Sequence, residues 1–70
     1  MPTYKIVTDS FAVDIDAANV NDAIEEAFDG EMHRPPTSLA ELDSRFAEIG
    51  DGARYRITCD VTGEEYQGQY

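Results

Sequence analysis

The side chains best spaced for joint chemistry are four carboxylates, Asp22, Glu25, Glu26 and Asp29. By the 3.6-residue period of an α-helix they fall within about 100° of its circumference, and no Lys or Arg lies between residues 19 and 30. Carboxylates one helical turn apart stand about 5–6 Å from each other. Duplex DNA carries about one charge per 1.7 Å of its axis. The row is therefore expected to present a line of negative charge, comparable with phosphates, to a channel lined by Lys and Arg.

Two plainer interpretations of the same row stay open. A charged row opposite an apolar one is also the ordinary solvated face of an amphipathic helix. A surplus of acid with few lysines is also the composition that a high-salt cytoplasm favours. Salt adaptation would tend to spread acid over every exposed face, so an uneven distribution of charge favours a binding surface over salt adaptation.

The chain as a whole is strongly acidic, with 15 Asp and Glu against 5 Lys and Arg, a net charge of −10. Arg45 lies four residues after Glu41, a favourable spacing for a helical ion pair, and the single lysine, Lys5, is expected on a strand face shared with acids. The remaining acids are expected to be uncompensated or peripheral to the helical row: Asp9, Glu31, Glu64 and Glu65. Anionic membranes and nucleic acid repel such a surface, so the composition argues against direct binding to either.

No other residues form a recognisable catalytic or metal-binding set. Cys59 is the single cysteine, which rules out an internal disulfide, and His33 has no partner at the spacing of a catalytic triad or a metal site. We expect no cofactor, no metal and no enzymatic activity. The absence of a signal-like N-terminus and of long apolar runs predicts a cytoplasmic protein.

The elements that position these acids can be read from caps and periodicity. Asn19 is expected to cap a helix with Asp22 at its N3 position and Gly30 at its end, and Ser38 with Glu41 forms a capping box that opens a second helix ending at Gly50. The apolar stripes of the two helices are Val20, Ala23, Ile24, Ala27 and Phe28, and Leu39, Leu42, Phe46 and Ile49. Between them, two consecutive prolines forbid helix.

Alternating residues predict the strands. Residues 3–8 and 11–16 form a hairpin if Asp9 and Ser10 are its turn, because this register puts the apolar side chains on one face and Lys5 opposite Asp14. Residues 55–61 alternate as a half-buried strand, and residues 65–70 are expected to return as a short fourth strand. The prediction is one α+β domain of residues 1–70: a two-layer fold with an antiparallel sheet of three or four strands and two helices on one face, in the order ββααββ.

In size, acidity and lack of a catalytic set, the chain resembles the small phage-encoded anti-CRISPR inhibitors, in particular those that mimic DNA. The resemblance is one of class, and no residue-level motif carries it. It implies a non-enzymatic inhibitor that blocks the DNA-reading surface of a basic nucleic-acid-binding complex, such as a CRISPR–Cas effector, in the cytoplasm of an infected cell. The alternative is an accessory domain of a halophile or phage whose acidity is a salt adaptation and which binds another protein through its sheet edge. Either a monomer or a homodimer, paired through an open edge at the first or last strand, is compatible with the sequence.

Overall fold

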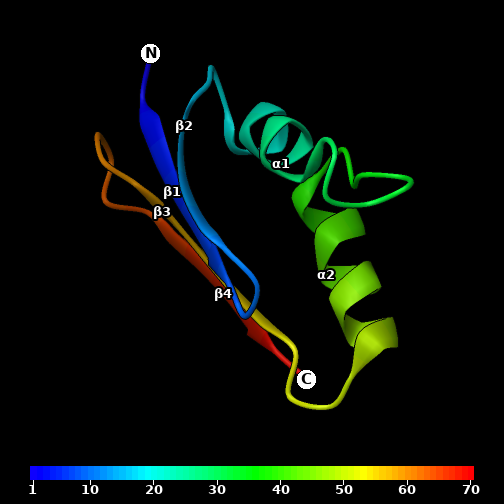
Figure 1. Ribbon diagram of the computed structural model, residues 1–70. Helices are drawn as coiled ribbons and strands as arrows, with labels where there is room; N and C mark the ends of the chain where they lie inside the picture. Colours follow the sequence, from blue (N-terminus) through cyan, green and yellow to red (C-terminus); the bar gives the residue numbers. More distant parts are fainter.

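The computed structural model describes residues 1–70 as one four-stranded antiparallel sheet with both helices on the same side of it (Figure 1). Its elements are β1 (Thr3–Thr8), β2 (Ala12–Asp16), α1 (Val20–Phe28), α2 (Leu39–Ile49), β3 (Arg54–Cys59) and β4 (Glu65–Gln69). The predicted α+β class, the order ββααββ and the fourth strand are confirmed. Neither helix has the length and apolarity needed to cross a membrane.

The β1–β2 hairpin has the predicted register. Ile6 pairs with Val13, and Lys5 pairs with Asp14. Because the side-chain period of a strand is two, this register sends Tyr4, Ile6, Val13 and Ile15 towards the helices and leaves Lys5 and Asp14 exposed on the open face. The turn is fixed by the Thr8 hydroxyl, which accepts hydrogen bonds from the backbone N–H groups of Ser10 and Phe11.

The sheet order β2-β1-β3-β4 corrects the prediction of its edges. An open edge was expected at the first or the last strand. The last strand, β4, is an edge. The first strand, β1, lies in the centre, paired on its other side with β3 through contacts such as Ile6 with Ile57. The edges are β2 and β4. Periodicity shows which face of a strand is buried but not which strands flank it, so the sequence could not assign the centre.

Both helices begin at the predicted caps. The Asn19 side chain accepts a hydrogen bond from the Asp22 backbone N–H at 2.9 Å, and Ser38 accepts one from Glu41 at 3.1 Å. α1 ends one residue earlier than predicted: its C-cap is Asp29, in an extended conformation, and the predicted Gly30 follows it with a φ of 87°. Asp29 therefore lies just beyond the helix instead of within its last turn.

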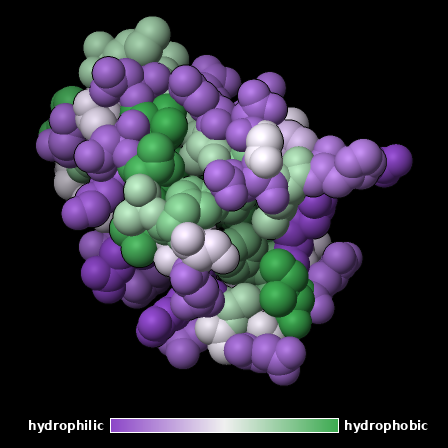
Figure 2. Space-filling model, viewed as in Figure 1, coloured by the Kyte–Doolittle hydropathy of each residue, from purple (hydrophilic) through white to green (hydrophobic).

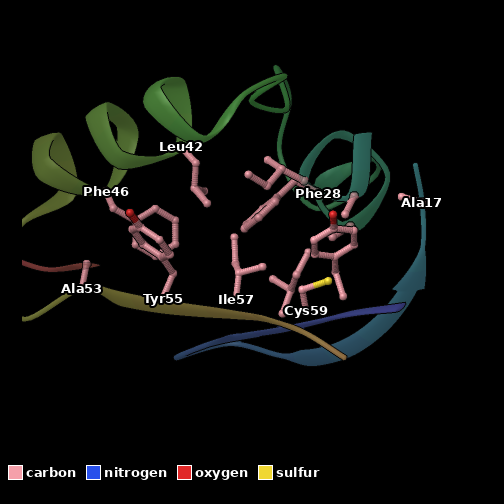
Figure 3. Close-up of a cluster of buried hydrophobic side chains, with 13 residues drawn as sticks. Ala17, Phe28, Leu42, Phe46, Ala53, Tyr55, Ile57 and Cys59 are labelled. Carbon is pink, nitrogen blue, oxygen red and sulfur yellow. The ribbon is translucent and has the colours of Figure 1, made fainter. Parts of the chain in front are cut away.

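The core lies between the sheet and the two helices. Figure 3 shows Leu42 and Phe46 reaching from α2 towards Tyr55 and Ile57 of β3, with Phe28 of α1 beside them. Edge-to-face ring contacts join Phe28 to Phe46 at 6.3 Å between centroids and Phe46 to Tyr55 at 5.4 Å. Such pairs add to the stabilisation from burial, so this aromatic chain ties both helices to the centre of the sheet.

Two apolar residues predicted to face the core are exposed. Ile49 is 55% exposed because it is the last residue of α2, and no further helical turn covers it. Val61 is 72% exposed because β3 ends at Cys59, whose carbonyl accepts a hydrogen bond from the Gly63 N–H and closes a turn. Ile49 thus lies at the end of its element and Val61 two residues beyond the end of its own.

Candidate protein-binding surface

The acids of helix α1 face the solvent because the opposite side of the helix is buried in the core. Ala23, Ile24, Ala27 and Phe28 are all buried, and α1 packs against β1, β2 and α2. The opposite side of the helix carries Asp22, Glu25 and Glu26, with Asp29 directly after it, and all four are exposed. These four residues are called the acidic row below. The helical phase that buries the apolar stripe is therefore the one that exposes the row.

The position of α1 is fixed at its N-terminal end. Asn19 and Asp22 share reciprocal hydrogen bonds, from the Asp22 N–H to the Asn19 Oδ1 at 2.9 Å and from the Asn19 Nδ2 to the Asp22 Oδ2 at 3.3 Å. The Asn21 Oδ1 accepts the backbone N–H of Leu39, the first residue of α2, at 3.0 Å. This bond satisfies one of the donors left free at the start of α2 and links the two helices. Asn21 was not identified from the sequence, because its partner lies far along the chain.

The acidic row lines a shallow hollow of about 430 Å³, together with Pro35 from the connector between the helices. No member of the row forms an ion pair within 4.0 Å, and no basic side chain lies in the last turn of α1. The chain's ion pairs lie elsewhere: Arg45 with Glu41 at 3.6 Å, Arg54 with Asp9 at 3.0 Å, and Arg56 with Glu65 at 3.5 Å. The structure thus brings four of the eight nominated acids together as uncompensated carboxylates.

The other four nominated acids lie in different surroundings. Asp9 and Glu65 were predicted to be uncompensated, which is wrong, since they pair with Arg54 and Arg56. Asp9 and Arg54 are 45 residues apart in the sequence, and only the β1–β3 pairing brings them together. Glu64 accepts a hydrogen bond from the Tyr66 hydroxyl, which raises the pKa of that tyrosine. Glu31 is exposed in the loop after α1 and does not line the hollow that the acidic row lines.

A second hollow, of about 870 Å³, lies on the open face of the sheet. Three of the five cations border it, namely Lys5, Arg54 and Arg56. The two arginines are occupied by their ion pairs, and Lys5 has Asp14 opposite it on β2. The open face is thus a mixed, largely balanced surface, in contrast with α1.

Two further polar groups serve the fold. The Asp43 Oδ1 accepts hydrogen bonds from the hydroxyls of Tyr70 and Tyr55, which hold the pKa of that carboxyl below its usual value. Cys59 is buried, and hydrogen bonds from Thr62 lower the pKa of its thiol. No three His, Cys, Asp or Glu side chains come together in a geometry that could hold a metal ion. The acidic row is therefore an array of separated charges and not a chelating cluster.

Comparison of the chain with protein-family models, with curated proteins and with solved structures finds no match in any of the three. The argument for function accordingly rests on the residues of this chain and their arrangement.

Proposed function

We propose that the protein is a non-enzymatic inhibitor that binds, through the acidic row of α1, a basic surface which its partner uses to bind nucleic acid. The observation that supports this is the concentration of four exposed carboxylates without an ion pair on one side of α1 and directly after it, whereas the three ion pairs of the chain all lie on the sheet and α2. A row of carboxylates on a rigid helix can occupy Lys and Arg side chains that otherwise contact phosphates. A CRISPR–Cas effector is one complex with such a surface.

The row has a cost for the fold, which favours a role in binding. Like charges three or four residues apart on a helix destabilise it by roughly 0.2–0.5 kcal/mol for each pair. Asp29 also lies at the negative end of the helix dipole, where an anion is disfavoured. Such a row of like charges on a helix with a well-formed N-cap is expected if a partner neutralises it.

The test is capture of basic proteins from lysates of candidate host cells by the immobilised protein. The wild type is compared with the double variant Glu25→Lys/Glu26→Lys and with a matched control, Asp14→Lys/Glu48→Lys, which changes the net charge equally outside the row. The expected result is capture of a nucleic-acid-binding protein that is lost at roughly 0.5 M salt, where screening is strong. Duplex DNA should compete with it.

The control variant should retain the captured protein and the α1 variant should lose it. Equal losses in both would mean that net charge alone governs capture, and equal retention would show that the row is not the contact. Circular dichroism of each variant establishes that it is folded before binding is compared.

A second candidate function is that of an accessory domain adapted to high salt, which binds another protein through an edge strand. It is favoured by the exposed acids outside α1, such as Asp14 and Asp16 on β2 and Asp51 before β3, together with the single lysine. This candidate predicts that the protein is unfolded at about 0.1 M salt and folds only as salt approaches molar concentration, where the Debye length falls to about 3 Å. Cooperative unfolding from a native state at low salt would contradict it.

A further inference from the structure

A small apolar groove opens at one end of the interface between the sheet and the helices, where the β1–β2 turn, the loop after α1 and the end of α2 meet. It is about 320 Å³ in volume, and buried Phe28, Phe46 and Ala53 lie beneath it. Half-exposed Phe11 and Met32 and exposed Ile49 form its walls. These six residues define the end groove. Figure 2 shows that apolar side chains reach the surface between the sheet and the helices instead of being wholly covered.

The residues that form the groove are held in place by contacts with the core. The rings of Phe11 and Phe28 meet edge to face at 5.3 Å between centroids, and Phe28 continues into the aromatic chain of the core. Met32 is held beside them, because its backbone N–H donates to the Phe28 carbonyl at 3.3 Å. Ligand pockets commonly have volumes of about 300–1,000 Å³, so this groove has room for one or two side chains and not for a helix.

The rim of the groove is acidic. Its lining residues include Asp9, Glu31 and Asp51 and no Lys or Arg. Asp9 is paired with Arg54, whereas Glu31 and Asp51 form no ion pair. An apolar recess with negative charge at its edge is complementary to an apolar side chain that is flanked by positive ones.

We propose that the end groove binds a partner segment in which a large aliphatic side chain is flanked by Lys or Arg. The inference rests on the proposed function for the basic character of the partner, and it adds an apolar anchor to the electrostatic contact. Anchors of this kind provide much of the affinity of protein interfaces, whereas exposed charges mainly govern association rate and specificity. Ile49 would close over the bound side chain and lose its exposure to water.

The probe is a synthetic hexapeptide, Lys-Arg-Leu-Leu-Arg-Lys, compared with the same peptide carrying two serines in place of the leucines. Binding is followed by the methyl NMR signals of Ile49, Met32 and Val61. The expected result is a shift of the first two signals and not of Val61, which lies on the β3–β4 turn. Burial of one leucine is worth about a 10- to 100-fold change in affinity, so the serine peptide should bind at least tenfold more weakly.

Three variants sharpen the test. Ile49→Ser should weaken binding of the leucine peptide at least tenfold, whereas Val61→Ser, which removes an even more exposed apolar side chain elsewhere, should leave it unchanged. The double variant Glu31→Gln/Asp51→Asn should weaken binding of the peptide with Lys and Arg. It should not weaken binding of a peptide with Gln in their place. Asn is suited to position 51, because Asp51 has a φ of 53° and Asn tolerates that conformation.

The proposal is overturned if the Ile49 and Met32 signals do not respond to the leucine peptide at millimolar concentration, or if both peptides bind equally. It is also overturned if sedimentation shows a dimer that Ile49→Ser converts to a monomer, since the occupant would then be a second copy of the chain. If the leucine peptide binds but no basic protein is captured from lysate, the proposed inhibitor function is refuted and the proposed binding by the end groove stands. If a basic protein is captured but the leucine peptide does not bind, only the proposed role of the end groove is refuted.

Discussion

Replacement of Glu26 by Lys should stabilise the folded protein. Glu26 lies four residues after Asp22 in the last turn of α1, which contains no basic residue. The substitution turns an unfavourable pair with Asp22 into a favourable one and places a cation near the negative end of the helix dipole. From pair energies of roughly 0.2–0.5 kcal/mol and a dipole contribution of about 0.3–1 kcal/mol, the free energy of unfolding should rise by about 0.7–2 kcal/mol at low ionic strength.

The assay is thermal and urea unfolding of the wild type, Glu26→Lys and Glu26→Gln. For a domain of this size, each kcal/mol corresponds to a rise in Tm of about 4–8 °C. Glu26→Gln removes the repulsion without adding an attraction, so its gain should be about 0.2–0.5 kcal/mol. In about 1 M salt, where the Debye length is about 3 Å, the gain of Glu26→Lys should largely disappear.

A Glu26→Lys protein that is no more stable than the wild type at low salt would refute the reasoning. So would a gain that is unchanged in about 1 M salt, because it would not be electrostatic. If stability rises while binding of a basic partner is lost, the same carboxylate opposes folding and supports binding. This opposite response is the signature expected of a binding surface.

Three further predictions concern the fold. Gly68→Ala should cost about 1–3 kcal/mol in urea unfolding, because a Cβ there would lie 2.6 Å from the Tyr55 Cε2 atom. Since the hydroxyls of Tyr70 and Tyr55 lower the pKa of Asp43, this carboxylate should stabilise the protein above its ordinary pKa and lose that effect as pH falls through the lowered value. The difference in Tm between wild type and Asp43→Asn, measured from neutral pH downward, should therefore shrink in acid; a constant difference would contradict it. Leu42→Ala removes a fully buried side chain and should cost about 2–5 kcal/mol, and calorimetry that detects a loss below about 1 kcal/mol would show that the core is looser than described.

Local patterns predicted much of the fold. The hairpin register followed from the agreement of both strand faces, since the pairing that buries Ile6 against Val13 also puts Lys5 opposite Asp14. The helix starts followed from Asn19 and Ser38, whose side chains can satisfy free N–H groups. These features depend on residues close in sequence, for which one register or one cap buries more apolar surface or satisfies more N–H groups than the alternatives.

The parts that sequence did not predict depend on distant contacts. The ion pair of Asp9 with Arg54 needs β3 beside β1, and the exposure of Ile49 needs the position of the helix end over the sheet. The acidic row was found because three of its members share one helix and the fourth directly follows it. The end groove was missed because three separate segments form it, and no periodic pattern connects Phe11, Met32 and Ile49.

The central position of β1 has a consequence for the order of folding. β1 meets β2 after a short turn, but it meets β3 only after both helices have been made. A two-stranded hairpin is marginally stable in water, and contacts between distant segments slow folding because a long loop must close first. A nascent chain that ends before Arg54 would leave one side of β1 unpaired. The domain should therefore gain its stability late in synthesis, and α1 becomes a fixed surface once β3 has closed the sheet.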